Sequence, residues 1–518
     1  GGRITFVWLF GIVGVFVLLL ACINFMNLST ARAEKRAKEV GIRKSIGSLK
    51  SQLVQQFLTE SFLVVFFAFI ISLLLVFLSL SWFNELADKK ISIPFSNPYF
   101  WLLNFAFIII TSLLAGAYPS FYLSAFQPVK VLKGTIRLGR FASLPRKVLV
   151  VVQFAVSVIL IIGTIVVYKQ IKFAQNRPIG YNREGLITIP KSDPNYEGKI
   201  DLLRNELLNT GMITDMELSS GTLTQISNNS SDFDWIGKQP REYSFATTNV
   251  SYGFGKMVGW HFIAGRDFSR SFATDTNKII INETAAKDMA FKDPIGQFVK
   301  TAGGTKTVQI VGVIKDMIMG SPYEPEKRAI FFLDAKYQSA SQIVIKIKST
   351  VSANTALPKI AAVFKNIVPS AGIDYKFVDE EYAKKFSQEQ RIGQLASFFA
   401  ILAIFISCLG LFGLASFVAE QRTKEIGIRK IVGASIFNIW KLLSKEFIGL
   451  VIISLFIACP VAYYFMNNWI KQYTYHVTIS WWIFAAAGAG ALVITLLTVS
   501  FQAIKAAVAN PVESLRSE

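Results

Sequence analysis

Two glycine-containing strings are the segments of this 518-residue chain that come nearest to a phosphate-binding loop. A nucleotide-binding loop of the Walker A type has the spacing G-x4-G-K-[ST], because its backbone amides hold the phosphates and its lysine reaches the terminal ones. Residues 134–141 lack that lysine and the hydroxyl residue after it, and residues 303–307 lack the spacing. The sequence therefore predicts that neither string binds ATP.

The side chains that usually form metal sites or catalytic triads are scarce and scattered. The two histidines, His261 and His476, lie far apart in the sequence, so neither a metal cluster nor a histidine-based triad is expected. The three cysteines, Cys22, Cys408 and Cys459, lie inside or at the ends of apolar runs, where packing is a more common role than disulfide formation. The sequence predicts no catalytic residue and no metal site on this chain.

The most specific pattern in the sequence is a charged block that occurs twice. Residues 33–47 read AEKRAKEVGIRKSIG and residues 419–433 read AEQRTKEIGIRKIVG, with ten of the fifteen positions identical at an offset of 386. Each block follows one long apolar run and precedes another, and Glu60 and Glu446 stand just before the next run. We infer that two copies of one unit make up much of the chain.

The order of residues within the block is repeated, and not only its charge. A loop that merely anchors the chain at a membrane surface needs lysine and arginine but no fixed order. On a helix, the glutamate and the arginine of each block are i,i+4 neighbours that can brace a surface turn, and the glycine between them either admits another backbone or bends the helix. We therefore favour a docking surface over a simple anchor. The candidate docking residues are Glu39, Gly41, Arg43, Lys44 and Gly47 in the first copy, and Glu425, Gly427, Arg429, Lys430 and Gly433 in the second.

Long apolar runs flank both blocks and must hold them in place. The chain is 52% hydrophobic and 17% charged, whereas soluble domains have about 25% charged residues. A helix of about 20 apolar residues crosses a bilayer core of about 30 Å. The predicted spans are residues 4–23, 61–83, 100–122, 148–168, 392–419, 447–470 and 481–501. They contain few ionisable side chains, which argues against a proton- or ion-driven carrier.

The net charge of +20 is distributed unevenly along the chain. Residues 169–391 hold 29 Lys and Arg against 24 Asp and Glu, whereas the remaining residues hold 25 against 10. Most of this surplus lies in the loops after the first, third and fifth spans, and the opposing short loops contain only Lys89, Lys90 and Lys471 among Lys and Arg. The positive-inside rule then makes the basic loops and the C-terminus cytoplasmic and places residues 169–391 outside. Such a distribution is typical of a membrane protein and argues against a nucleic-acid partner.

The repeat and the spans together predict the domain organisation. We expect a first three-span unit in residues 1–146, a leading span in 147–168, an extracytoplasmic domain in 169–391 and a second three-span unit in 392–518. A cytoplasmic C-terminus after seven spans places Gly1 outside, although nothing before it could have carried it there. We therefore expect the sequence to be a fragment that lacks at least one N-terminal span.

The outer segment has the pattern of an α+β domain. Strand-like runs occupy residues 187–189, 279–281, 310–314 and 343–348, and helical periodicity occurs at 199–208 and 357–368. The segment 219–234, which is rich in Ser, Thr and Asn, is predicted to be a solvated loop.

The doubled KEVGIRK and KEIGIRK blocks, the units of three spans plus one and the outer domain before the last three spans resemble the MacB/FtsX superfamily of ABC transporter permeases. They are most similar to the single-chain, two-unit permeases of Bacteroidetes, and the string ACINFMNLSTAR at 21–32 resembles the start of the first block in that group. Strings at 265–268, at 282–286 with 293–296, and at 311–316 resemble pieces of the MacB-like periplasmic core domain. We interpret each of them as a turn, a helix cap or a strand edge rather than as a ligand site.

This resemblance implies a polytopic α-helical membrane protein, with seven spans seen and eight expected, and an α+β extracytoplasmic domain of the MacB-like type. It implies a non-catalytic permease subunit in the bacterial inner membrane, whose two blocks act as coupling helices for a cytoplasmic ABC ATPase dimer. ATP and Mg²⁺ belong to that dimer, and no cofactor is expected on this chain. In the family, movement passes to the outer domain by mechanotransmission, which serves efflux or extraction of a substrate. MacB itself has one four-span unit and carries its ATPase on the same chain, and this sequence departs from it on both counts.

Two other functions are compatible with part of this pattern. An FtsX-like regulatory membrane protein, which transmits an ATPase signal to an outer hydrolase, would share the same features. A membrane-anchored enzyme with its site in residues 169–391 would need a clustered nucleophile, base or metal set, and the sequence supplies none. Membrane lipid is an expected partner, and the sequence leaves open whether a periplasmic adaptor and an outer-membrane channel join the complex.

Overall fold

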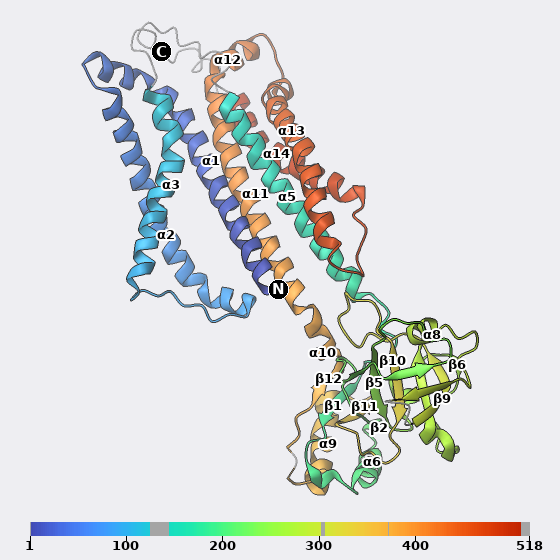
Figure 1. Ribbon diagram of the computed structural model, residues 1–518. Helices are drawn as coiled ribbons and strands as arrows, with labels where there is room; N and C mark the ends of the chain where they lie inside the picture. The colour runs from blue at the N-terminus through green and yellow to red at the C-terminus, as the bar shows by residue number, and fades with distance from the viewer. Residues whose placement is uncertain (1, 125–143, 302–305, 371, 509–518) are drawn as a thin grey trace. The chain divides into compact units, whose positions relative to one another are not determined.

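The computed structural model describes residues 2–124, 144–301, 306–370 and 372–508 (Figure 1). The chain divides into two compact units. The first, called the membrane unit below, consists of Gly1–Lys169, Gln390–Ile470 and Thr478–Glu518, and the second, the outer unit, consists of Gln170–Glu389 and Lys471–Val477. The predicted basic loop after the third span, with Lys130, Lys133, Arg137 and Arg140, lies mostly outside the described residues, as do the string 134–141 and most of 303–307.

Seven helices of the described chain are long and apolar enough to cross a membrane. They are α1 (Gly2–Ser45), α2 (Lys50–Ala87), α3 (Pro98–Ser124), α5 (Leu144–Gln175), α11 (Ser387–Gln421), α13 (Ile436–Ile470) and α14 (Trp481–Val508). Each contains one of the predicted apolar runs, so the seven expected spans are confirmed as helices. The short helix α12 (Thr423–Ile431) lies between α11 and α13.

The two repeated units meet where α1 crosses α11. A Cβ atom placed on Gly410 of α11 would lie 2.6 Å from Asn24 Oδ1 of α1, and one on Gly413 would lie 2.7 Å from Leu28 Cδ2. Asn24 and Gly410 are separated by the repeat offset of 386. The two copies of the repeat therefore touch at equivalent positions. The Asn24 side chain occupies the space that Gly410 leaves free.

The helix α5 is the most enclosed of the seven. Its residues Val158, Ile162 and Val166 are fully buried. The hydroxyl groups of Ser157 on α5 and Ser407 on α11 share a hydrogen bond of 2.9 Å. A polar contact of this kind holds two helices together where lipid supplies no alternative partner.

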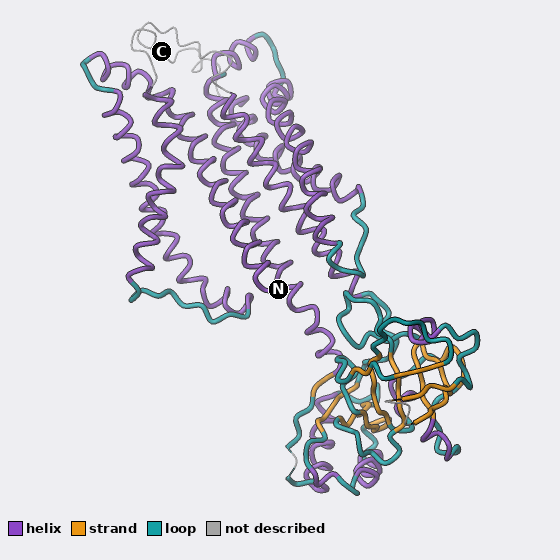
Figure 2. The backbone as a smooth tube through the Cα atoms, viewed as in Figure 1, coloured by secondary structure: helices purple, strands orange, loops and turns teal. Residues whose placement is uncertain are grey.

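All strands of the described chain belong to one mixed sheet in the outer unit (Figure 2). Its order is β12-β1-β11-β2-β5-β10-β7-β9-β8-β4, with β3 paired to β5 and β6 paired to β9. The strands are β1 (Leu186–Pro190), β2 (Ile213–Ser219), β3 (Asn229–Ser230), β4 (Phe233–Trp235), β5 (Phe245–Val250), β6 (Phe262–Gly265), β7 (Lys278–Asn282), β8 (Phe298–Thr301), β9 (Lys306–Ile314), β10 (Ala329–Leu333), β11 (Gln342–Ile347) and β12 (Lys376–Phe377). The helices of this unit are α6 (Ile200–Asn209), α7 (Phe254–Val258), α8 (Glu283–Met289), α9 (Ala353–Ile367) and α10 (Val378–Ala383).

The sheet has two parts that are joined at one point. Strands β2 and β5 are paired only at Ser219 and Val250. On the β2 side, Leu203 of α6 and Phe364 of α9 pack into one buried core. On the β5 side, Phe245 and Ile330 belong to a second core. A third core, around Phe331, also contains Leu186 of β1 and Val344 of β11, so it joins the two parts of the sheet.

The strand and helix predictions for the outer domain hold, with one correction. Strands β1, β7, β9 and β11 and helices α6 and α9 lie at the predicted positions. The segment 219–234 is not simply a solvated loop, because it contributes β3 and the start of β4 and buries Leu223, Thr224 and Phe233. The Phe233 ring lies edge-on to Phe245, 5.3 Å away, a long-range contact that the polar composition of the segment conceals.

The strings that resemble the periplasmic core domain include a tight backbone approach and a helix cap, whereas 311–314 is not a strand edge, because β9 pairs there with both β6 and β7. Gly265 has φ +75°, and a Cβ there would lie 2.1 Å from the Val311 carbonyl oxygen, because β6 passes close to β9. Asn282 caps α8 by accepting a hydrogen bond of 3.1 Å from the Ala285 N–H. Asp316 accepts a second one of 2.8 Å from the Thr284 N–H.

Candidate functional site

Each repeated block forms the end of a helix, and each is followed by its own tight turn. The first block is the end of the continuous helix α1, and the second contains the separate helix α12, because the chain breaks its helix at Arg422. Gly41 lies inside α1 and Gly427 inside α12. Neither copy has a helix break at this glycine, and the break in the second copy comes five residues earlier, at Arg422.

The predicted glutamate–arginine pairs are present in both copies. Arg43 Nη2 lies 2.7 Å from Glu39 Oε1, and Arg429 Nη2 lies 2.6 Å from Glu425 Oε1. All four side chains are about half exposed, so each pair adds only about 0.3–0.5 kcal/mol to helix stability. Their repetition therefore points to a role beyond stability.

Both blocks end in the same turn. Gly47 has φ +105° and Gly433 has φ +94°, a conformation that a residue with a side chain rarely adopts. The Gly47 N–H donates to the Lys44 carbonyl at 3.1 Å, and the equivalent bond joins Gly433 to Lys430 at the same distance. In each copy the next residue donates to the carbonyl of the arginine, which completes a Schellman motif. Lys44 and Lys430 lie in the last turn, where the helix dipole favours positive charge.

Among the described side chains, both blocks bury a residue at the same position of the repeat. Val40 in the first copy and Ile426 in the second are separated by the repeat offset, and both are buried. This residue, called the anchor below, packs against two residues of the following span, which are also equivalent in the two copies. The sets are Val40, Leu53 and Phe57 in the first copy, and Ile426, Ile439 and Leu443 in the second.

The same blocks expose apolar side chains, which the sequence analysis missed. Ile42 is 48% exposed and Ile428 is 55% exposed, and the pair at the turn, Ile46 and Val432, are both 81% exposed. These positions are also related by the offset of 386. Repeated apolar residues among repeated charges were the signal in the sequence, but only the structure separates the buried anchor from the exposed pair.

Polar contacts tie each block to neighbouring spans. In the first copy, Arg43 Nη1 donates to Gln56 Oε1 at 2.9 Å, and the Gln56 amide donates to Glu60 at 3.3 Å. In the second copy, Glu446 forms two ion pairs. Its Oε2 lies 3.2 Å from Arg422 Nη2, and its Oε1 lies 2.7 Å from Lys147 Nζ of α5. Glu60 and Glu446, near the start of the following span in each copy, thus take part in these contacts.

A pocket lies beside the second block. It has a volume of about 250 Å³ and is lined by residues that include Gly427, Lys430, Glu420 and Lys505. Gly427 is buried at this position.

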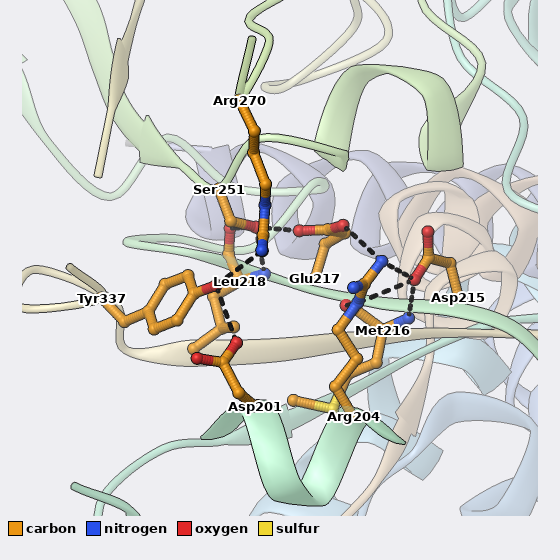
Figure 3. Close-up of polar contacts among 9 residues, drawn as sticks. All are labelled: Asp201, Arg204, Asp215, Met216, Glu217, Leu218, Ser251, Arg270 and Tyr337. Carbon is orange, nitrogen blue, oxygen red and sulfur yellow. Dashed lines mark hydrogen bonds and ion pairs between the residues drawn. The ribbon is translucent and has the colours of Figure 1, made fainter. Parts of the chain in front are cut away.

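The outer unit contains a polar cluster at the junction of the two parts of its sheet (Figure 3). Glu217 of β2 is buried and accepts a hydrogen bond from the hydroxyl of Ser251, which follows β5. Arg204 of α6 lies 2.8 Å from Asp215 and 3.5 Å from Glu217. Burial raises the pKa of Glu217, and a Cβ on Gly253 would lie 2.1 Å from its Oε1. The cluster therefore links α6 and β2 to Ser251, the residue that follows β5.

Two sequence families match the chain. The family described as FtsX-like permease C-terminal matches residues 11–128 and 397–511. The family described as MacB-like periplasmic core domain matches residues 149–363, between those two segments. The matches therefore cover both sets of three spans and the outer domain.

Curated proteins and solved structures of this group are similar over parts of the chain. The macrolide export ATP-binding/permease protein MacB of Aggregatibacter actinomycetemcomitans is 23% identical over 212 residues, which cover 38% of this chain and 32% of that protein. The MacB protein of Escherichia coli is 27% identical over 125 residues, which cover 22% of this chain and 19% of that protein. The chain thus matches about a third or less of the length of these relatives.

A solved structure of the periplasmic region of MacB from Actinobacillus actinomycetemcomitans is 14% identical and covers 39% of this chain and 93% of that chain, with a TM-score of 0.28. The assignment to a family depends on the sequence matches instead. Because the FtsX-like family matches both copies of the repeat and the MacB-like family matches the domain between them, the chain belongs to the MacB/FtsX superfamily of ABC transporter permeases, which are multi-pass proteins of the inner membrane.

Proposed function

We propose that this chain is the permease subunit of an ABC transporter whose ATP hydrolysis takes place on a separate cytoplasmic ATPase dimer. The two blocks are its docking surfaces, and the basic loops and the C-terminus are on the cytoplasmic side. ATP and Mg²⁺ bind to the ATPase, and the chain itself carries no cofactor. The curated relatives are named for export, and we propose export or extraction of a substrate outside the cytoplasmic membrane.

One observation carries this proposal: both blocks bury the same anchor and expose the same apolar pair. A helix end that is held by Val40 or Ile426 on one side leaves Ile42 and Ile46, or Ile428 and Val432, accessible on the other. Exposed apolar side chains within a rim of charges are the usual composition of a protein interface. Two equivalent surfaces suit a partner that is itself a dimer.

The contacts behind the blocks support a mechanical role. A partner that moves the second block pulls on Glu446 through Arg422, and Glu446 also holds Lys147 of α5. In the first copy the path runs from Arg43 through Gln56 to Glu60. We propose that ATP-driven closure of the dimer displaces the blocks, and that the spans pass this displacement to the outer domain.

Exchange of the charged pair tests the docking surface. In Glu425→Arg with Arg429→Glu, the i,i+4 ion pair and the helix are retained, while the charges that face the partner are inverted. We expect binding of the ATPase to weaken by about tenfold or more, because like charges then meet across the interface. ATP hydrolysis becomes uncoupled from transport, while membrane insertion is unchanged. The measurements are the amount of ATPase that co-purifies and the nucleotide-dependent transport activity.

The outer unit offers a matched control. Lys287 and Glu283 form an exposed i,i+4 pair at 2.7 Å, and their exchange alters charge in the same way far from the blocks in the sequence. This control is expected to bind the ATPase like the wild type. Unchanged binding and coupling in the Glu425/Arg429 exchange would contradict the docking surface.

A further inference from the structure

The outer domain is inserted between two spans, α5 and α11, and each of these helices is held at its outer end by a different loop. The loop between α13 and α14 contacts the end of α5, and the turn after α2 contacts the start of α11. The first loop belongs to the second copy of the repeat and the second to the first copy. Neither contact is part of the docking surface described above.

The loop 471–477 is hydrogen-bonded to α5 through one buried glutamine. The Gln170 amide nitrogen donates to the Tyr475 carbonyl at 2.9 Å, and its amide oxygen accepts from the Val477 N–H at 2.9 Å. Gln170 is buried, so both bonds are shielded from water. Removing the amide would leave two backbone groups without partners, which is costly in a buried site.

The Tyr475 ring is enclosed on both sides by residues at the end of α5 and just after it. Its ring stacks on Phe173 with 4.6 Å between centroids, and the Arg177 guanidinium lies 4.2 Å from its centroid. The Tyr475 N–H donates to the Tyr323 carbonyl at 3.1 Å. Buried Arg177 in turn donates to the carbonyls of Pro322 and Glu324, at 2.8 and 2.7 Å. The loop, the end of α5 and the segment 322–324 are therefore one packed assembly, which is called the α5 clasp below.

A lighter contact holds α11. Asp88 ends α2 with φ +51°, and its Oδ2 lies 3.0 Å from Arg391 Nη1. About two helical turns further along α11, the ring of Phe398 lies 5.8 Å from that of Trp82. These four residues form the α11 clasp, which joins the first repeat to a span of the second. The ion pair is largely exposed, so it can open and close more easily than the buried α5 clasp.

We propose that these two clasps are the points through which the membrane spans move the outer domain. This inference rests on the proposed function, because it assumes that ATP moves the spans. The chain enters the outer domain from α5 and leaves it into α11, so these two helices carry a force into it, together with the loop 471–477 that contacts Tyr323. The α5 clasp connects α13 and α14 to the first helix, and the α11 clasp connects α2 to the second. Movement of one repeat relative to the other thus acts on the domain at both of its attachments.

The experiment measures an ATP-dependent distance in the full-length chain, purified with its ATPase in lipid nanodiscs. Spin labels are placed on cysteines at Ser96 and Lys336, which are exposed residues of the membrane unit and the outer unit. The native cysteines are replaced by alanine. The wild type is expected to show a shift in the distance distribution between the nucleotide-free and the ATP-vanadate states.

Two sets of variants test the clasps separately. Asp88→Arg places two positive charges together and is expected to lose at least half of the shift, and the exchange Asp88→Arg with Arg391→Asp is expected to restore it. Gln170→Met and Tyr475→Ala remove the α5 clasp and are expected to lose most of the shift. Lys89→Glu, a charge reversal beside Asp88, is the matched control and is expected to behave like the wild type.

Each outcome bears on a different statement. A shift of wild-type size in both Asp88→Arg and Tyr475→Ala would overturn the clasps while leaving the proposed function intact. A loss in Asp88→Arg that the charge exchange does not restore would overturn the α11 clasp. A wild type that hydrolyses ATP without any shift would contradict the proposed function and the clasps with it.

Discussion

Neighbouring residues within each repeated block have different tasks because a helical turn points them in different directions. Val40 is buried against Leu53 and Phe57, whereas Ile42, two positions later, is about half exposed. Arg43 turns back to Glu39 and also reaches Gln56. Six consecutive residues therefore anchor, brace and expose a surface, which explains why their order is repeated along with their charge.

The glycine that ends each block has a backbone requirement that can be tested. In Gly47→Val and Gly433→Val, a β-branched residue is forced to adopt a positive φ, at a cost of about 1–2 kcal/mol each. The turn is expected to shift, which displaces Ile46 or Val432 and weakens binding of the ATPase several-fold. The measurement is the affinity of the purified chain for its ATPase.

Gly237 supplies the control for this prediction. It lies in the outer unit with φ +88°, and no atom lies within 4 Å of the point that a Cβ would occupy. Gly237→Val carries a similar backbone strain and is expected to bind the ATPase like the wild type. Wild-type affinity in both block variants would show that the turn is not part of the docking surface.

Asp267 makes the stability of the outer unit depend on pH. Burial raises the pKa of this carboxyl to about 6, although the N–H groups of Phe268 and Lys256 donate to it. At pH values between about 4 and about 6, the folded state keeps the Asp267 proton that the unfolded state has lost. The free energy of unfolding of the outer unit therefore falls as pH rises through this range and then levels off. The measurement is hydrogen exchange of peptides from 254–268 in the full chain across this range.

Asp267→Asn removes the titrating group and keeps a side chain of the same shape. The decline in protection between pH 4 and pH 6 is expected to become shallower in this variant than in the wild type. Asp293→Asn, at an exposed position, is the matched control and is expected to follow the wild-type curve. Identical curves for Asp267→Asn and the wild type would contradict the prediction.

At the scale of elements, the crossing of α1 and α11 depends on a pair of unlike residues at equivalent positions. Asn24 needs the space above Gly410, and Gln153 of α5 also approaches the same point, with its amide nitrogen 3.1 Å from a Cβ placed there. Asparagine in both copies would crowd this point, and glycine in both would leave a gap. The two copies have therefore diverged where they touch.

Gly410→Leu tests this crossing. The added side chain overlaps with Asn24 and Gln153, so we expect a loss of about 1–3 kcal/mol in stability and a lower melting temperature in nanodiscs. The exchange Asn24→Gly with Gly410→Asn keeps one large and one small residue at the crossing. Its melting temperature is therefore expected to lie close to that of the wild type. Gly449→Leu on α13, where no atom lies within 4 Å, is the matched control. Equal melting temperatures for Gly410→Leu and Gly449→Leu would contradict the close crossing.

At the scale of the whole molecule, the division into spans and an outer domain was predictable. All seven apolar runs are helices, because a run of about 20 apolar residues has no other way to satisfy its backbone in lipid. Strands β7, β9 and β11 were predictable as well, since their short runs of β-branched residues are buried in a sheet. The exception is segment 219–234, where Phe233 is buried by residues far away in the sequence.

The candidate docking site was predictable in part. The i,i+4 ion pairs follow from local helix geometry and are present in both copies as predicted. The helix break at Arg422 and the exposure of Ile46 and Val432 were not foreseen, because they depend on how each block packs against the next span. The two blocks are nearly identical in sequence, yet only one of them is continuous with the preceding helix.

The sequence by itself determined which segments are spans, that the unit occurs twice, and where several strands of the outer sheet lie. These properties depend on hydrophobicity and on spacing along the chain, so each segment carries its own information. Only the tertiary structure decided that Ile426 is an anchor whereas Ile428 is exposed, and that Asn24 faces its own equivalent. It also decided that Gln170 bonds to the loop 471–477 and that Asp88 pairs with Arg391 of α11. Such contacts join residues whose separation in the sequence is arbitrary, and packing alone brings them together.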